Sequence, residues 1–371
     1  MKLLIITHTL HKKQNNTYFA YGPYIKEMWL WEKYADVIQI IAPLTPEVPE
    51  AIELHYNHEN IHLNQVPDFS LIGIKNTIKT VFKIPGIIFK VFKAMRAADH
   101  IHLRCPGNMG LLGCVMQVFF PKKKKTAKYA GNWDPAAKQP LSYRFQKWIL
   151  NNTFLTRNMQ VMVYGHWPKA SKNLLPFFTA TYADSKKQRI TKEFTPPFKA
   201  LFVGGLTPGK DPLYALQLVH RLQQKGVDIC MDLYGEGVQR KKLEQYIEKH
   251  KLKKSITLKG NQAAEVIEQA YKAGHFLILP SKSEGWPKAV AEAMFWGCVP
   301  MATTVSCVPE MLGNGKRGRL LSKNPEEDEP HLLELLSDKE TMKRMSLSAQ
   351  QWSQQFTLEA FEEKIKQLIE G

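Results

Sequence analysis

The stretch from Pro280 to Pro300, PSKSEGWPKAVAEAMFWGCVP, constrains the fold more than any other part of this sequence. It follows a short aliphatic run, HFLILP, that is typical of a buried parallel strand. A polar turn comes next, Pro287 stands where a first helical residue would, and Gly297 follows the helical pattern as a stop signal. The stretch therefore predicts a strand, a loop and a short helix over residues 289–296, whose first backbone N–H groups are available to an anion.

Two carboxylates flank the predicted helix start. Glu284 lies in the loop and Glu292 in the helix, with seven residues between them. On one continuous helix they would lie roughly 80° apart, so we expect Glu284 to point from the loop and Glu292 from the second turn, both toward whatever the helix start binds. Ionised carboxylates accept hydrogen bonds and sugar hydroxyls donate them, so the pattern favours a ligand with phosphate and hydroxyl groups. Two solvated surface charges are the alternative interpretation.

The whole stretch resembles the E-x7-E motif of the group 1 family of retaining glycosyltransferases, because PS, EG, P, EAM, G and P occur in the same order. The resemblance implies an α/β protein of the GT-B type, with two Rossmann-like, doubly wound parallel-sheet domains facing across a cleft. It also implies a UDP- or GDP-linked sugar as donor substrate and no separate cofactor. The sequence contains no Asp-x-Asp motif, and such enzymes generally work without a divalent metal, so no metal site is expected.

Two glycine turns further upstream are similar to other motifs of that family. FVGGLTPGKDP puts Gly204 and Gly205 at a strand end and Lys210 just before a helix, where the family has VGRL…KG. The family usually has arginine at the position of Gly205, so Lys210 is the one matched cation of the motif. YGEG, which contains Gly235, resembles the G-x-G loop near the nucleotide, and Asn261 follows a strand in a loop similar to the one near the base.

The resemblance assigns roles to these residues in the second half of the chain. The diphosphate is expected on Lys210 and on the amides of the Pro287 helix, the ribose hydroxyls on Glu292, and the donor sugar on Glu284. The complete donor-binding set predicted in this way is Gly204, Gly205, Lys210, Gly235, Asn261, Glu284, Gly285, Trp286, Pro287, Lys288 and Glu292.

The predicted catalytic residues are Glu284, Lys210 and Asp134, but no side chain is an obvious general base. Asp134 belongs to the GNWDP turn near a predicted strand end of the first half. His102 and His166 lie near other strand ends. A structural role is the alternative for each of these three residues.

Short aliphatic runs alternate with helical patterns along the chain, which predicts two parallel α/β domains. We expect an acceptor-binding domain over residues 1–180, a linker over 181–198, a nucleotide-sugar domain over 199–355 and a last helix over 356–371. That helix either crosses back to the first domain, as in GT-B proteins, or caps the second. The first half has predicted strands that begin near Lys2, Asp36, Asp99, Lys124 and Met159, helices around 19–33, 72–98, 110–119 and 142–150, and loops of interest at 8–22, 104–108 and 131–135.

Positive charge is concentrated in the first half of the chain. The net charge is +17, and residues 1–180 contain 23 Lys and Arg against 10 Asp and Glu. Within residues 72–98, lysines recur beside bulky apolar residues at helical spacing on both sides of Pro85-Gly86, which breaks the pattern. A basic helix of this kind suits an anionic membrane surface, as does the run Lys122 to Lys125. The alternative is a helix packed on the sheet with a solvated lysine face, and this is favoured after Pro85.

These features together predict a cytoplasmic glycosyltransferase, peripheral on the inner face of the membrane, in cell-surface polysaccharide or glycolipid synthesis. Its partners would be a nucleotide sugar and a glycan or lipid-linked acceptor, and no nucleic acid. A sugar-nucleotide epimerase or a phosphorylase of the same fold is one alternative. A basic, non-catalytic nucleic-acid-binding protein is another, although its lysines are not interleaved with aromatics in a recognised binding module.

Overall fold

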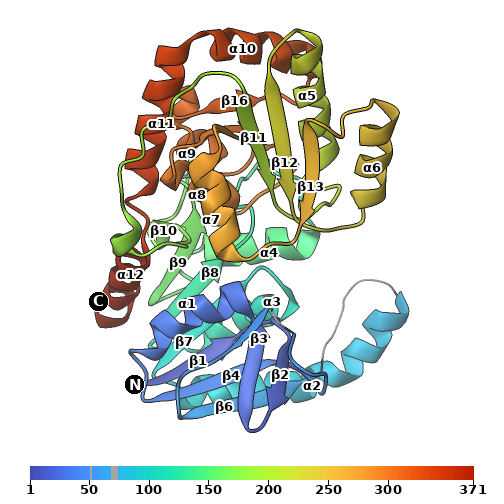
Figure 1. Ribbon diagram of the computed structural model, residues 1–371. Helices are drawn as coiled ribbons and strands as arrows, with labels where there is room; N and C mark the ends of the chain where they lie inside the picture. The colour runs from blue at the N-terminus through green and yellow to red at the C-terminus, as the bar shows by residue number, and fades with distance from the viewer. Residues whose placement is uncertain (51, 68–73) are drawn as a thin grey trace. The chain divides into compact units, whose positions relative to one another are not determined.

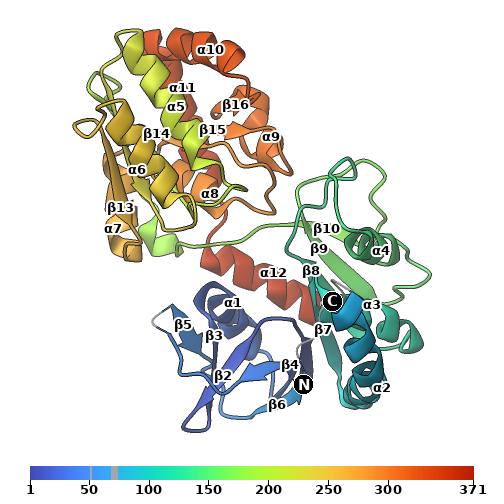
Figure 2. The same cartoon turned by 90° about the vertical axis from the view of Figure 1, so that its right-hand side faces the viewer.

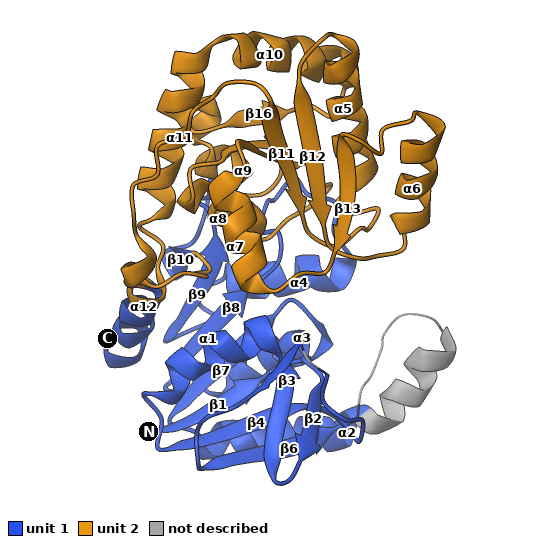
Figure 3. Ribbon diagram, in the orientation of Figure 1, with its two compact units in different colours: residues 1–177, 361–371 blue, residues 178–360 orange. Residues whose placement is uncertain are grey.

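The computed structural model describes residues 1–50, 52–67 and 74–371, with side chains from residue 84 onward in the last range (Figure 1). The chain divides into two compact units (Figure 3). The first consists of residues 1–177 and 361–371, and the second of residues 178–360.

In its described part, the first unit is built on a sheet of ten strands. Their order is β10, β9, β8, β7, β1, β4, β2, β3 and β5, and β6 pairs with β4. Neighbouring strands are parallel, except that β3 runs antiparallel to β2 and β5. The five strands predicted in this half are confirmed as β1, β4, β7, β8 and β9. The bounds are β1 Lys2–Ile6, β2 His11–Gln14, β3 Thr17–Tyr21, β4 Val37–Thr45, β5 Glu53–His55, β6 Ile61–Val66, β7 His100–Cys105, β8 Lys124–Tyr129, β9 Met159–Tyr164 and β10 Leu174–Phe177.

The helices of the first unit largely follow the predicted pattern. They are α1 Gly22–Glu32, α2 Ile74–Ala97, α3 Asn108–Met116 with the 3₁₀ turn η1 Gln117–Phe119, and α4 Leu141–Leu150. The helix predicted from residue 19 is wrong at its start, because residues 17–21 form β3. Asn15 and Asn16 make the hairpin turn between β2 and β3 with φ of 47° and 63°, a conformation that Asn tolerates.

Helix α2 corrects the prediction of a break at Pro85. The helix is continuous through this proline. Ile87, Val91 and Met95 recur at helical spacing and are buried in the core with β1, β7 and β8, so packing against the sheet offsets the missing backbone donor. This burial confirms that the helix packs on the sheet after Pro85. Lys75, Lys79 and Lys83 in the preceding half lie outside the residues whose side chains are described.

The second unit contains a six-stranded parallel sheet in the order β13, β12, β11, β14, β15, β16. Numbered within the unit, this is the order 3-2-1-4-5-6 of a Rossmann sheet. The strands are β11 Phe198–Val203, β12 Ile229–Tyr234, β13 Ile256–Gly260, β14 Phe276–Leu279, β15 Val299–Thr303 and β16 Arg319–Leu321. The helices are α5 Pro212–Gln224, α6 Arg240–Lys249, α7 Ala264–Ala273, α8 Lys288–Phe295, α9 Val308–Met311, α10 Pro325–Ser337 and α11 Lys339–Ser353, and 3₁₀ turns lie at η2 Asp184–Lys186 and η3 Gly313–Gly315.

The last helix, α12 (Leu358–Glu370), begins in the second unit, and its residues from Phe361 onward group with the first. There the ring of Phe361 packs edge-on against Phe177, with centroids 5.0 Å apart. Lys33 Nζ lies 2.6 Å from a carboxylate oxygen of Glu362. None of the helices in the described part of the chain is long and apolar enough to cross a membrane.

Candidate nucleotide-sugar site

The strand order of the second unit fixes where a ligand can bind. Chain connections diverge between β11 and β14, and in such sheets ligands bind outside the carboxyl ends of the strands at this point. Lys210 lies in the loop after β11, and Glu284 lies in the loop after β14. Lys210 Nζ is 2.5 Å from Glu284 Oε1, and the Glu284 residue is only 8% exposed. The structure therefore brings these two predicted residues together at the switch point.

The loop that carries Glu284 is held by hydrogen bonds from both neighbouring strands' loops. Lys282 N donates to Gly209 O at 2.8 Å. On the other side, the carbonyl of Gly285 accepts from Ser306 Oγ at 3.1 Å and from Cys307 Sγ at 3.2 Å. Sequence reasoning missed Ser306 and Cys307, since nothing near them signals that β15 ends beside the Glu284 loop. Burial raises the pKa of the Cys307 thiol to about 12, so it remains a donor.

Glycines bring the loops after β11, β12 and β13 into contact. Gly235 has φ +133°, and a Cβ there would lie 2.0 Å from the carbonyl oxygen of Gly204. Gly204 N donates to Tyr234 O, and Gly235 N donates to Gly260 O, at 2.9 and 2.8 Å. The predicted residue Asn261 directly follows Gly260 and is exposed. Gly205 is also exposed, and a Cβ there would meet its nearest side-chain atom, on Thr207, at 3.5 Å.

Helix α8 forms where it was predicted, one residue earlier. It spans Lys288–Phe295, so Pro287 is the N-cap rather than the first helical residue. Gly297 has φ +75° and ends the helix as expected. Just before the cap, Trp286 stacks on Trp352 with ring centroids 6.0 Å apart. This contact fixes the loop against α11, which carries Trp352.

Glu292 has protein donors of its own. Its carboxylate accepts from Thr181 Oγ1 at 2.8 Å and from Tyr271 OH at 3.3 Å. Burial raises the pKa of Tyr271 well above its usual value, and the nearby Glu292 charge adds to this rise. The phenol therefore stays protonated as a donor. A carboxylate offers about four lone-pair sites, so it can accept hydrogen bonds from several donors at once.

The three loops of interest in the first unit meet at the carboxyl ends of its central strands. A Cβ at Gly107 would lie 2.6 Å from His8 Nδ1, and one at Gly131 would lie 3.1 Å from Pro106. Ala130 N donates to Cys105 O at 2.6 Å. Residues around 8, 107 and 131 therefore form one packed edge of the sheet.

Of the three candidate bases in the first unit, His102 has a structural role. It is fully buried, its Nδ1 lies 2.9 Å from Thr126 Oγ1, and its ring lies 4.3 Å from that of Trp31. Burial lowers its pKa well below the usual value, and it has no access to a substrate. His166 is exposed beyond β9. Asp134 accepts from Ala136 N at 2.8 Å through Oδ1 and is partly exposed; it belongs to the first unit, whereas Lys210 and Glu284 belong to the second.

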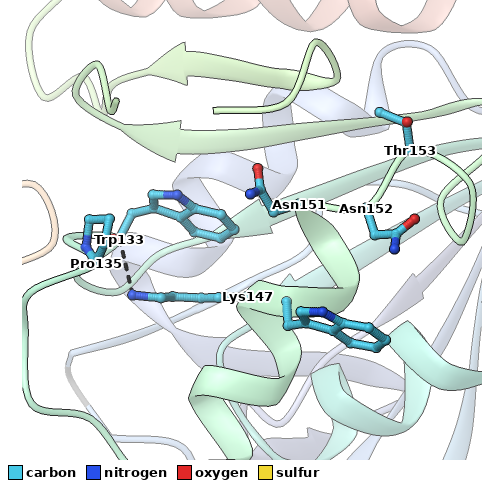
Figure 4. Close-up of a pocket in the computed structure, with 7 residues that line it drawn as sticks. Trp133, Pro135, Lys147, Asn151, Asn152 and Thr153 are labelled. Atoms are coloured by element: carbon cyan, nitrogen blue, oxygen red, sulfur yellow. Dashed lines mark hydrogen bonds between the residues drawn. The ribbon is translucent and has the colours of Figure 1, made fainter. Parts of the chain in front are cut away.

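A hollow of about 490 Å³ opens beside the GNWDP turn (Figure 4). Lys147 Nζ donates to the carbonyls of Trp133 and Asp134, each at 3.0 Å, and so ties the turn to α4. The wall also contains the exposed ring of Trp148 and the polar side chains of two asparagines and a threonine, which can donate hydrogen bonds. The lining residues are Trp133, Pro135, Lys147, Trp148, Asn151, Asn152 and Thr153.

A buried ionic cluster lies under α1 in the first unit, and no local sequence pattern predicts it. Glu27 accepts from Arg104 and, at 2.8 Å, from Lys128 Nζ. Burial would raise the pKa of Glu27, but the two cations outweigh it and hold that pKa at about 2. Arg104, at the start of the 104–108 loop, is therefore committed to Glu27. Among the described residues, no three His, Cys, Asp or Glu side chains are grouped to hold a metal ion.

Comparison with known proteins agrees with this geometry. Residues 184–352 match the family model described as glycosyl transferases group 1. An uncharacterized glycosyltransferase of Methanocaldococcus jannaschii is 29% identical over 160 residues, which are 43% of this chain and 44% of that protein. A putative colanic acid biosynthesis glycosyltransferase, WcaL, of Salmonella typhimurium is 28% identical over 34% of this chain and 33% of its own length. The chain thus matches less than half of the length of these curated relatives.

The structural match extends over the whole chain. The HepE protein of Anabaena, solved with UDP and glucose, covers 100% of this chain and 99% of its own, with a TM-score of 0.68 and 15% identity. Residues 184–352 are therefore similar to the group 1 glycosyl transferases, and the chain as a whole has the GT-B fold.

Proposed function

We propose that this protein transfers a glycosyl group from a nucleoside diphosphate sugar to an acceptor hydroxyl, with retention at the anomeric carbon. The observation that carries the proposal is the Lys210–Glu284 pair, held at the switch point of a Rossmann sheet beside the start of α8. A cation beside a buried carboxylate suits a ligand that is anionic at one end and rich in hydroxyls at the other.

In this proposal, Lys210 and the first amides of α8 bind the diphosphate. Negative charge grows on the diphosphate as the glycosyl bond breaks, and fixed cations and backbone dipoles stabilise it without reorganisation. Glu284 accepts from hydroxyls of the donor sugar, and Lys210 orients that carboxylate. Gly204, Gly205 and Gly235 let the backbone approach the nucleotide closely.

The proposal places the nucleoside between α8 and the loop that follows β13. Glu292 would accept from the ribose hydroxyls while it keeps Thr181 and Tyr271 as donors, and Asn261 would lie near the base. Gly285, Trp286, Pro287 and Lys288 connect the two carboxylates and complete the donor-binding set. Asp134 in the first unit remains the candidate acceptor-side acid or base.

We further propose a glycan or lipid-linked acceptor in cell-surface polysaccharide or glycolipid synthesis, on the cytoplasmic face of the membrane. The relative WcaL supports this choice, since it is a putative colanic acid biosynthesis glycosyltransferase. WaaG, a solved structure with a TM-score of 0.63 and 13% identity, is a glycosyltransferase involved in lipopolysaccharide biosynthesis. The membrane contact proposed over residues 72–98 is supported in its described half, where Lys90, Lys93 and Arg96 are exposed.

The test is a screen of UDP- and GDP-linked sugars by thermal shift, in buffer with excess chelator. A ligand at 100 times its Kd adds about 2.7 kcal/mol of stability to the protein, so binding gives a clear rise in the melting temperature. We begin with UDP because HepE was solved with it. With the matching donor, nuclear magnetic resonance should show a product with the donor's anomeric configuration. An inverted product, or activity that needs added manganese, would contradict the proposed mechanism.

A further inference from the structure

Large apolar side chains are exposed along one side of the first unit. Of the fourteen large apolar side chains that are exposed among the described residues, eight lie between residues 89 and 154. Six of these eight are aromatic. Monomeric proteins rarely display so many bulky apolar groups in one region unless the region meets a partner. The eight are Phe89, Phe92, Val115, Phe119, Leu141, Phe145, Trp148 and Phe154.

Six of these residues lie on the three helices α2, α3 and α4, whereas Phe119 lies in η1 and Phe154 in the turn after α4. Figure 2 shows α4, α3 and α2 one below the other along one side of the first unit. α3 packs against both α2 and α4. The ring of Phe92 on α2 contacts that of Phe120 after α3, with centroids 5.0 Å apart. The outer surfaces of α2, α3 and α4 therefore form one continuous face, which we call the three-helix face.

Helical spacing shows that the exposed positions point away from the core. On α4, Leu141, Arg144, Phe145 and Trp148 are exposed at the spacing i, i+3, i+4, i+7. Gln146 and Leu150 on the opposite side are buried. On α2, residues 89, 92, 93 and 96 follow the same spacing and are exposed. Each outer stripe thus combines bulky apolar residues with a basic residue.

The charge of this region identifies its partner. Residues 84–158 contain 13 Lys and Arg, of which Arg104 and Lys128 are buried against Glu27, and only two acidic residues, Asp99 and Asp134. Lys93, Arg96 and Arg144 are exposed within the stripes themselves. Aromatic side chains mixed with basic ones are what an anionic membrane interface takes up, since the rings enter the headgroup region and the cations meet phosphate.

We propose that the three-helix face is a docking surface for an anionic phospholipid bilayer, with Leu141, Phe145 and Trp148 of α4 as its apolar anchor. The donor-lined hollow beside Trp148, with Lys147, Asn151 and Thr153 in its wall, is placed to receive a headgroup phosphate. This extends the contact proposed above for residues 72–98 to α3 and α4, and so rests on that part of the proposed function. It does not depend on donor binding.

Three of the four lysines of the 122–125 run do not contribute to the face as free cations. Lys123 and Lys125 donate to backbone carbonyls of Ala98 and Phe120, at 2.6 and 2.8 Å. Lys124 Nζ lies 3.3 Å from Ile369 O of α12. The run is therefore mostly structural, which corrects the expectation that it meets lipid headgroups as a block.

The experiment measures binding of the full chain to vesicles by flotation. Vesicles of phosphatidylglycerol and phosphatidylcholine should bind the protein, and pure phosphatidylcholine should bind it weakly. The variant Leu141→Ser/Phe145→Ser should lower the partition coefficient about tenfold. Val238→Ser/Val266→Ser, which removes two exposed apolar residues of the second unit, is the matched control and should bind as the unchanged protein does.

Charge is tested separately. Lys93→Glu/Arg144→Glu should lose binding, whereas Lys241→Glu/Lys242→Glu on α6 makes the same change of net charge on an exposed helix of the second unit and should have little effect. Brominated lipid should quench tryptophan fluorescence less in Trp148→Phe than in the unchanged protein. UDP binding should be the same in all these variants, so a failure of the donor proposal would be seen independently of vesicle binding.

Three results would overturn the proposal. If Leu141→Ser/Phe145→Ser bound vesicles as well as the control Val238→Ser/Val266→Ser does, α4 would not be the anchor. Oligouridine serves as a single-stranded nucleic-acid probe. If Lys93→Glu/Arg144→Glu lost binding to oligouridine but bound vesicles as the unchanged protein does, the face would be a nucleic-acid surface. A dimer that dissociates in Leu141→Ser/Phe145→Ser would identify the face as a contact between copies of this chain.

Discussion

In the proposed donor site, the loop after β11 contributes one cation, Lys210, to the diphosphate. Gly205 on the same loop provides no second one. Lys210→Ala removes the proposed phosphate contact and leaves the buried Glu284 carboxylate without its partner. We expect the affinity for UDP to fall about tenfold, which is roughly 1.4 kcal/mol, and the affinity for uridine to change little. Lys210→Arg keeps the charge and should lose less. Calorimetric titration with the two ligands measures both effects.

A matched control for this change is Lys253→Ala. Lys253 also pairs with a carboxylate in the second unit, Glu248 at 3.1 Å, but both side chains are exposed. The control should bind UDP normally. Equal weakening of UDP and uridine by Lys210→Ala would place Lys210 away from the phosphates.

The resemblance of two turns to family motifs predicts that Lys210 and Glu284 share one site. The structure brings the two side chains to 2.5 Å, at the ends of β11 and β14. Ser306 and Cys307 were missed because their role comes from the pairing of β14 with β15, which no local pattern encodes. For His102 the structure supports the structural role, since its ring is fully buried beside Trp31 of α1.

At the scale of the elements, the loops after β11 and β12 depend on Gly235. Any side chain there would collide with the Gly204 carbonyl, and φ is +133°. We expect Gly235→Ala to push these loops apart, to destabilise the second unit by more than about 2 kcal/mol and to weaken UDP binding. Urea unfolding and titration with UDP measure the two effects.

Gly226 offers the matched control for this substitution. Its φ is +86°, but a Cβ there would meet no atom within 4 Å. Gly226→Ala should therefore cost only the backbone term, about 1 kcal/mol, and leave UDP binding unchanged. If the two variants behave alike, backbone conformation and not loop contact determines the effect at Gly235.

Elements with a strong local pattern were predictable, and elements that depend on tertiary packing were not. β14, the Glu284 loop and α8 follow from the aliphatic run, the proline and the glycine stop. The β2–β3 hairpin was read as helix at residues 19–21, although its Asn-Asn turn was a usable signal. The continuity of α2 through Pro85 could not be predicted, since the burial of Ile87, Val91 and Met95 decides it.

At the scale of the whole molecule, the two units share parallel sheets but differ in what they bury. In the second unit, each described charge pair includes at least one partly exposed side chain. The first unit buries three imidazoles: His11 and His100, whose pKa burial lowers to about 4, and His102, whose pKa is lowered well below the usual value. His100 and His102 share Thr126 Oγ1 as a hydrogen-bond partner.

This burial makes the first unit sensitive to mild acid. In the unfolded chain these imidazoles bind protons as the pH falls below about 6.5. In the folded chain their pKa values are lower, so they bind protons only at much lower pH. Stability is therefore complete above pH 6.5 and is lost as the pH falls toward 4. In this window each buried histidine lowers the free energy of unfolding by about 1.4 kcal/mol per pH unit, so the three together lower it by about 4 kcal/mol per pH unit. Glu32, whose pKa burial raises, opposes this with a single group.

Scanning calorimetry between pH 7.5 and 5.5 tests this prediction. The transition of the first unit should move to much lower temperature in acid. His100→Gln keeps a polar partner for Thr126 and removes one titrating group, so the drop should shrink by about a third although the protein starts less stable. His62→Gln changes an exposed histidine and should leave the pH dependence as it is. A drop of the same size in His100→Gln and in the unchanged protein would mean that the buried imidazoles do not cause the acid sensitivity.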